Sequence, residues 1–288
     1  MSVFARTADA GYVYDPKWEQ ETARLLANQA IWDRGTIERL DRLGVTDGWT
    51  CLEIGAGCGS IARRLVELTG SGGRVMATDL VTERLEWLRA HGVEVRRHDV
   101  TADELPDRAF DLIHARMVMQ HLPDRETVVT RLRNALRPGG WLYLEDTDPS
   151  PAFRAAAEDP ALAVVVPAGY QVMREAGFDD RGGQADVEVM LQCGLEDVSA
   201  DGRVELVQGG STQSRNYVLW LDYLGPRIRA RGLADDDLIR AAREWLGDPS
   251  HRWLSQVMIS AFGRRPLDSA STGGQVIAGE RRAIAEGG

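Results

Sequence analysis

The stretch Cys51–Gly59, with the sequence CLEIGAGCG, decides the fold of this chain. Its apolar first half predicts a short buried strand, its glycines predict a tight turn, and the run Ser60–Thr69 that follows predicts a helix. Because glycine has no Cβ, such a turn lets a ligand lie directly on the backbone. The unpaired N–H groups at the start of the helix then face that ligand. The stretch therefore predicts a small cofactor at this turn.

The spacing of the glycines narrows the choice of cofactor. A dinucleotide site needs G-x-G-x-x-G, but the glycines here are Gly55, Gly57 and Gly59, and Ser60 stands at the third dinucleotide position. Glu53 precedes the first glycine by two residues, where its charge would repel a pyrophosphate and suit an ammonium group. The pattern favours a cofactor with a positively charged amino-acid end, although three glycines alone also fit a plain turn.

A second strand with an acid at its carboxyl end strengthens this prediction. The segment Gly73–Asp79 (GRVMATD) places Asp79 twenty residues after Gly59, the spacing at which an acid accepts hydrogen bonds from ribose hydroxyls. The alternative is that Asp79 caps the helix expected to begin near Thr82, although it stands early for an N-cap. We therefore interpret Asp79 as the ribose ligand.

Four ordered motifs between Trp49 and Asp146 together resemble the class I S-adenosylmethionine-dependent methyltransferases, in particular their small-molecule branch. These motifs are LEIGAGCG at 52–59, ATD at 77–79, FDLIHA at 110–115 and LRPGGWL at 136–142. The resemblance implies S-adenosyl-L-methionine as the cofactor. It also implies a doubly wound α/β fold, a mostly parallel seven-stranded Rossmann-like sheet with N-terminal helices and helical lid insertions. Together with the glycine turn, it indicates a set of cofactor-binding residues: Glu53, Gly55, Ala56, Gly57, Gly59, Asp79, Leu80, Asp99, Val100, Arg116 and Gln120.

Composition excludes several classes of function. The 288-residue chain has a net charge of −10, which disfavours nucleic-acid substrates. Its three cysteines form no CxxC motif and its five histidines no HxxxH pair, so we expect no metal site and a reducing, cytoplasmic location. No apolar run approaches the roughly 18 residues of a membrane span, and the first ten residues lack a signal-peptide core. We expect a small-molecule acceptor as the partner, no membrane association and, as a possibility, a homodimer.

Strands and helices alternate after Thr50, which indicates a parallel sheet with helices on both faces. We expect strands near 50–54, 74–79, 93–97, 110–115 and 140–145, with a last strand over 253–262, and helices near 59–70, 82–91 and 124–136. Before the sheet, the sequence predicts two helices, one that Pro16 opens and a second over 36–43 that ends at Gly44. We predict an N-terminal helical lid over 1–48, a cofactor-binding core over 49–148, the rest of the sheet over 149–266 and a flexible tail over 267–288. Within 149–266, lid insertions are expected near 149–183 and 209–248.

Acids and a histidine at the carboxyl ends of the strands are candidates for chemistry, because those ends meet at one edge of a parallel sheet. The resemblance implies that Asp99 accepts from the adenine amino group while the Val100 N–H donates to a ring nitrogen; a turn aspartate is the alternative. His121 and Asp146 are the candidate catalytic residues. His121 is either a base or, as we favour, a structural or cofactor-side residue. Asp146 either faces the substrate or is a solvated loop charge.

Aromatic residues in the expected lid segments are candidates for the acceptor site, because they can stack on a substrate and exclude water. They are Tyr12, Tyr14, Trp18, Tyr170, Tyr217 and Trp220. Aromatic residues at helical spacing also occur simply as core, and for Tyr217 and Trp220 this is the more frequent arrangement.

The sequence therefore predicts an enzyme, a methyltransferase that acts on an oxygen, nitrogen or carbon atom of a small molecule such as a secondary metabolite. Two alternatives stay open. The chain could use the same cofactor as a scaffold for a reaction other than methyl transfer, since the binding motifs would be identical. A nicotinamide-dependent oxidoreductase is less compatible with Ser60 and Glu53.

Overall fold

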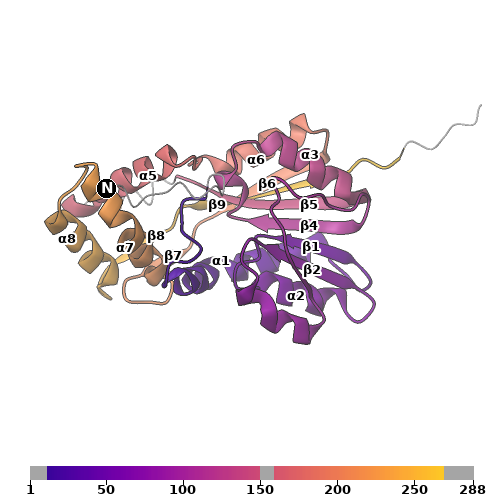
Figure 1. Cartoon of the computed structure of the whole chain (residues 1–288), viewed down its shortest axis with the longest axis horizontal. Helices are drawn as coiled ribbons and strands as arrows, with labels where there is room; N and C mark the ends of the chain where they lie inside the picture. Colours follow the sequence, from indigo (N-terminus) through magenta and orange to yellow (C-terminus); the bar gives the residue numbers. More distant parts are fainter. Residues whose placement is uncertain (1–11, 150–158, 269–288) are drawn as a thin grey trace, which may run out of the picture.

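A seven-stranded sheet forms the centre of the computed structural model, which describes residues 12–149 and 159–268 (Figure 1). The strand order is β3-β2-β1-β4-β5-β9-β6; β9 runs antiparallel to both of its neighbours, and the other pairs are parallel. The strands are β1 (Thr50–Ile54), β2 (Arg74–Asp79), β3 (Glu94–Arg97), β4 (Phe110–Arg116), β5 (Leu136–Asp148), β6 (Glu196–Arg203) and β9 (Val257–Arg264). The predicted seven-stranded, mostly parallel sheet is confirmed.

Helices cover both faces of the sheet, as the alternating sequence pattern predicts. On one face lie α1 (Glu21–Leu43) and α2 (Ser60–Thr69); on the other lie α3 (Arg125–Ala135) and α6 (Gly182–Gln192) (Figure 1). Buried strands must be apolar on both faces. Leu52 and Ile54 of β1 accordingly pack in the cluster under α3 and α6, whereas Cys51 packs in the cluster under α2.

The strand order reverses beside β1, whose two neighbours are β2 and β4. A crevice opens at such a point because the loops that leave the two adjacent strands turn to opposite faces, and ligands bind there at the carboxyl ends of the strands. The short 3₁₀ helices η1 (Glu83–His91) and η2 (Met119–His121) follow β2 and β4 at this edge. The fold therefore brings the predicted site residues to one end of the sheet.

A helical layer lies beyond that end of the sheet. It consists of α5 (Pro160–Glu175), α7 (Ser214–Ala230) and α8 (Asp236–Gly247), which pack on one another, with α7 also touching α1 (Figure 1). The two-stranded sheet of β7 (Leu206–Gln208) and β8 (Arg252–Leu254) lies beside it. Buried apolar residues of these helices form one cluster with Tyr14 and Trp32 of the N-terminal region. The predicted domain boundaries stay predictions, but the helices of both expected insertions do meet.

Local structure differs from the sequence-based expectation in three places. The N-terminal region forms one helix, α1, rather than two, because Ile31, Trp32, Thr36 and Leu40 continue a single buried stripe. The segment near 82–91 is a 3₁₀ helix. The last expected strand is divided into β8 and β9. Within the described ranges, no helix has the length and hydropathy that a membrane-spanning segment requires.

Candidate functional site

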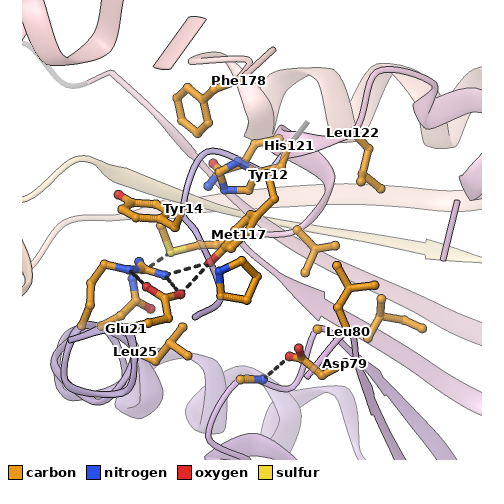
Figure 2. A pocket seen from close by; sticks show the side chains of 18 of the residues that line it. Tyr12, Tyr14, Glu21, Leu25, Asp79, Leu80, Met117, His121, Leu122 and Phe178 are labelled. Atoms are coloured by element: carbon orange, nitrogen blue, oxygen red, sulfur yellow. Dashed lines mark hydrogen bonds and ion pairs between the residues drawn. The ribbon is translucent and has the colours of Figure 1, made fainter. Parts of the chain in front are cut away.

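An open cleft of about 1450 Å³, solvent at its mouth included, lies between the carboxyl ends of the strands and the helical layer. Figure 2 shows Asp79 and Leu80 on its sheet side, with Tyr12, His121 and Phe178 opposite them. Twelve of the predicted site residues line this cleft: Gly55, Gly57, Asp79, Leu80, Asp99, Val100, Gln120, Tyr12, Tyr14, His121, Tyr170 and Trp220. The remainder are placed elsewhere.

The glycine turn after β1 forms part of the cleft wall. Gly55 has a φ of 64°, in the left-handed region, and a Cβ added there would lie 2.5 Å from Cγ2 of Val118. Both the conformation and the space therefore require glycine at this position. Val118 also lines the cleft, so any side chain at Gly55 would push Val118 against a bound ligand.

Asp79, the last residue of the neighbouring strand β2, fixes the glycine turn by hydrogen bonds. Its Oδ2 accepts from the Gly57 N–H at 2.9 Å, and its Oδ1 accepts from the Val81 N–H at 3.0 Å. Burial raises the pKa of Asp79, while the N–H groups of Val81 and Gly57 oppose that rise. Each carboxylate oxygen has a second lone pair. The carboxylate can thus bind two ribose hydroxyls without losing its backbone partners.

Asp99 lies further along the same wall. Its Oδ1 accepts from the backbone N–H and the hydroxyl of Thr101, at 2.9 and 2.6 Å. The described residues provide no donor to Oδ2. Val100 lines the cleft beside Asp99. This arrangement leaves a carboxylate oxygen and an apolar side chain for a planar base, as the family resemblance implies.

The N-terminal helix contributes an ion pair that the sequence analysis missed. Glu21 accepts from Arg24 at 2.7 and 2.8 Å, and Nη2 of Arg24 donates to the Tyr12 hydroxyl at 2.8 Å (Figure 2). The guanidinium group also lies 3.8 Å above the ring of Tyr14. Asn28, one turn further on, lines the cleft as well. The signal that could have found them is the spacing 21, 24, 28, which places polar side chains on one helix face.

His121 lines the cleft on the side opposite Asp79 and Leu80. The centroid of its ring lies 5.0 Å from that of Tyr12, edge-on, and 5.2 Å from that of Phe178. Its Nδ1 is buried and has no hydrogen-bond partner among the described residues. Burial and the nearby charges of Arg24 and Arg125 lower its pKa to about 3. The imidazole is therefore uncharged at neutral pH.

Asp146 does not line the cleft, contrary to the expectation that it faces the substrate. Side chains of a strand alternate between its two faces, and Asp146 points toward α6, where it is 1% exposed and lies against Gly182. Its pKa is raised to about 7 by burial, which the charge of Arg125 only partly offsets; the carboxyl of Asp186, also fully buried, adds repulsion between the pair. The solvated-loop alternative is equally wrong.

Two charged residues expected at the cofactor lie on the α1 face of the sheet instead. Glu53 accepts a hydrogen bond from Nδ1 of His114 at 2.8 Å, and Arg116 pairs with Asp33 at 2.7 Å. Neither is on the cleft wall, so the argument from an ammonium beside Glu53 finds no support in the structure. Ala56 is buried against α2 and Gly59 precedes that helix, so both shape the turn from behind.

Trp18 and Tyr217 belong to the core of the helical layer rather than to the cleft wall. Trp18 packs on Tyr223 with ring centroids 5.0 Å apart. Tyr217 donates to Oε1 of Gln256 at 2.9 Å and lies edge-on to Trp253. The alternative noted for aromatic residues at helical spacing, that they are core, applies to both.

His114 is the centre of a buried charge network under the glycine turn. Its Nδ1 lies 2.8 Å from Glu53 and its Nε2 lies 3.4 Å from Glu145. Glu145 also forms an ion pair with Nη1 of Arg203 at 2.6 Å. Burial by itself lowers the pKa of His114, but the two carboxylates outweigh it and raise the pKa to about 9. His114 is thus a buried imidazolium that joins β1, β4 and β5.

Replacing His114 by glutamine is expected to lower the free energy of unfolding by about 3–5 kcal/mol, because two buried carboxylates lose the cation between them. The native protein should show a matching pH dependence. The folded pKa of about 9 exceeds the ordinary 6.5, so this stabilisation is complete below pH 6.5 and is lost as the pH rises through 9. The loss is on the order of 3 kcal/mol.

Urea unfolding of both proteins between pH 6 and 10 measures this effect. In the native protein the free energy of unfolding should fall as the pH rises through 9. The variant should lack the part of this fall that deprotonation of His114 causes. Parallel curves for the two proteins across that range would show that His114 is not charged in the fold.

Comparison with known proteins identifies the core of the chain. Residues 52–144 match a family model described as "Methyltransferase domain". Methyltransferase GfsG of Streptomyces halstedii is 36% identical over 140 residues, which are 46% of this chain and 49% of GfsG. An arsenite methyltransferase of Aquipseudomonas alcaligenes is 32% identical over 114 residues, 35% of this chain and 33% of that protein. The chain thus matches half or less of the length of these relatives.

Solved structures share the fold. The YcgJ protein of Bacillus subtilis superimposes with a TM-score of 0.54 over 81% of this chain and 99% of that one, at 16% sequence identity. The seven-stranded sheet flanked by helices is therefore a Rossmann-like fold, shared with this solved structure.

Proposed function

We propose that this chain, which carries a class I S-adenosylmethionine-dependent methyltransferase domain, transfers a methyl group to an oxygen, nitrogen or carbon atom of a small molecule. One observation carries the proposal. The glycine turn and Asp79 form one wall of a cleft whose opposite wall is aromatic and holds an uncharged histidine. A nucleoside cofactor and an organic acceptor would thus meet inside one cavity.

The residues on the sheet side fit the cofactor. Asp79 would hold the ribose, Asp99 and Val100 the adenine, and the Gly55–Gly57 turn the amino-acid end, where Gly55 leaves room that a Cβ would fill. Asn28 on α1 offers a donor to a carboxylate at that end, where Arg116, expected from the sequence to bind the cofactor, does not reach; Arg24 is held by Glu21. S-adenosylmethionine, when bound, supplies a methyl group on a cationic sulfur.

The protein's part in such a reaction is to position the acceptor and to exclude water, since charge is neutralised rather than created during the displacement. Tyr12 and Tyr14 belong to the segment that crosses the cleft. This segment is fastened at both sides: the Tyr223 hydroxyl accepts from the Asp15 N–H at 2.6 Å, and Arg84 donates to the Pro16 carbonyl at 2.7 Å. The segment therefore shields the proposed reaction site from solvent.

His121 would act by hydrogen bonding rather than as a strong base. General-base catalysis is most efficient when the pKa lies near the operating pH. The pKa of His121, lowered to about 3 by burial and by two arginines, is far below that range. An uncharged imidazole can still accept a hydrogen bond from a hydroxyl or amine and so orient its lone pair toward the methyl group. The low pKa argues against the base, and contact with the acceptor differs from the structural or cofactor-side role favoured from the sequence.

The composition of the cleft and of the chain supports a small organic acceptor. None of the three cysteines lines the cleft, whereas soft elements such as arsenic prefer thiolate ligands, so we do not extend the arsenite substrate of the relative to this chain. The net charge of −10 disfavours nucleic acid. A cytoplasmic location is supported by the unpaired cysteines; a homodimer stays a prediction that sedimentation would test.

Calorimetric titration separates this proposal from its alternatives. We expect one equivalent of S-adenosylhomocysteine to bind and NADH to give no heat. Incubation with S-adenosylmethionine carrying a labelled methyl group and a panel of small organic acceptors should then give a labelled product. Binding of NADH in place of S-adenosylhomocysteine would contradict the cofactor, and binding without a labelled product across a broad panel would contradict methyl transfer.

A further inference from the structure

The acceptor side of the cleft carries no net charge. Among the described residues that line the cleft, Asp79, Arg84 and Asp99 lie on the cofactor side, and the other charged side chains are Glu21 and Arg24, which neutralise each other at 2.7 Å. Burial raises the pKa of Tyr12, and it raises the pKa values of Tyr14 and Tyr170 to about 12, so these phenols stay protonated. An unpaired ion bound here would lose its hydration without gaining a counter-ion.

Three uncharged polar side chains on this wall have no side-chain hydrogen bond with any described residue. They are Asn216, in the first turn of α7, His121 and Tyr14, whose ring lies under Arg24. Their neighbours are already satisfied: Gln256 accepts from Tyr217 at 2.9 Å and donates to Tyr170 at 3.2 Å. Trp220 donates to Sδ of Met173 at 3.2 Å. The free hydrogen-bonding capacity of the wall therefore lies on the amide of Asn216, the imidazole of His121 and the hydroxyl groups of Tyr14 and Tyr170, of which only the amide and the imidazole are not phenols.

The rest of the wall consists of aromatic rings. The ring of Tyr170 lies 6.1 Å from that of Trp220 and 6.3 Å from that of Phe178. The indole of Trp220 is fixed against the backbone of α5, since a Cβ at Gly169 would lie 2.2 Å from it. Rigid aromatic faces of this kind bind planar or ring-bearing ligands.

From these observations we infer the class of the acceptor: an uncharged, ring-bearing compound whose hydroxyl or carbonyl group is bound by Asn216 and His121. This inference rests on the proposed function. It adds that the enzyme selects against both carboxylate and ammonium forms of a substrate of the same size. It also makes Asn216 a specificity-determining residue, which neither the sequence motifs nor the domain match contain.

Three bicyclic probes of similar size test the inference: 2-naphthol, 2-naphthoate and 2-naphthylmethylammonium. Each is titrated at pH 7 into protein saturated with S-adenosylhomocysteine. We expect 2-naphthol to bind at least about 10-fold more tightly than either charged probe, because only the charged probes lose hydration without a counter-ion. A charged probe that binds as tightly as 2-naphthol, or no binding of 2-naphthol at millimolar concentration, would overturn the inference.

Variants connect the preference to the residues. Asn216→Leu should weaken 2-naphthol binding about 10-fold while leaving naphthalene binding within about twofold, because only the hydroxyl contact is lost. Trp220→Ala should weaken both. Trp245→Ala is the matched control, because Trp245 stacks on His251 away from the cleft wall and should change neither. An unchanged 2-naphthol affinity in Asn216→Leu would remove that residue from the inference.

The binding of S-adenosylhomocysteine in the same preparations separates this inference from the proposed function. If S-adenosylhomocysteine does not bind, the proposed function fails. If it binds while 2-naphthol has no advantage over the charged probes, only the acceptor class is wrong.

Discussion

Asp79→Ala is expected to weaken the binding of S-adenosylhomocysteine by at least about 100-fold. The carboxylate would accept hydrogen bonds from two ribose hydroxyls, and a hydrogen bond to a charged group contributes about 1.5–3 kcal/mol. The same side chain holds the Gly57 and Val81 N–H groups in the unbound protein, so the variant also loosens the glycine turn. Isothermal titration calorimetry measures the effect directly.

A matched acid on the surface serves as the control for Asp79. Glu86→Ala removes an exposed carboxylate of η1 whose partner is Arg89, and it should leave the affinity within about twofold. Asp79→Asn keeps the shape of the side chain and should give an intermediate loss. If Asp79→Ala binds S-adenosylhomocysteine as tightly as the native protein does, Asp79 is not the ribose ligand.

Gly55→Ala is expected to abolish measurable cofactor binding. An alanine there has an unfavourable left-handed conformation, which costs about 1–2 kcal/mol, and its Cβ would collide with Val118 at 2.5 Å. Val118 lines the cleft, so its displacement would narrow the space in which the cofactor would lie. The strain reduces stability, whereas the displacement of Val118 removes the binding site.

Two further variants separate strain from displacement. Gly92 also has a positive φ, 81°, but no atom lies within 4 Å of a Cβ added there. Gly92→Ala should therefore lose stability through backbone strain to a comparable degree and keep cofactor binding. The double variant Gly55→Ala/Val118→Ala removes the colliding methyl groups and should regain much of the affinity. Normal binding by Gly55→Ala alone would mean that the cofactor does not lie on this turn.

Sequence reasoning succeeded where local patterns determine position. The spacing of residues leaves little freedom in the placement of three features. They are the strand that contains Leu52–Ile54, the glycines after it and the acid that ends β2. The carboxyl ends of parallel strands must meet at one edge, so Asp79 and Asp99 reach one cleft although they are distant in sequence. The sheet and the cofactor side of the site were therefore predictable.

It failed where the face of a strand decides the role of a side chain. Glu53 and Asp146 stand at the correct ends of β1 and β5, but Glu53 points toward α1 and Asp146 toward α6. Only the packing of those helices shows that both acids are enclosed. Strand alternation alone would have separated Glu145 from Asp146, yet both are buried. Glu145 is covered by α1, and Asp146 by α6, a helix that follows much later in the chain.

The acceptor side could not be assigned from local patterns either. Tyr170 and Trp220 belong to two helices that meet through tertiary packing, and nothing in their spacing distinguishes them from Tyr217, which is core. Arg24 and Asn28 were missed although both fall within the first expected N-terminal helix, because no local pattern shows which face of that helix lines the cleft. One continuous helix places both on the face that lines the cleft.

A crystal structure of the protein with S-adenosylhomocysteine tests the central claim most directly. We predict the ribose hydroxyls on the carboxylate of Asp79, the adenine beside Asp99 and Val100, and the thioether sulfur facing the side of the cleft that holds Tyr12 and His121. A structure in which this cleft stays empty at saturating ligand, or in which the nucleoside lies away from Asp79, would contradict the account.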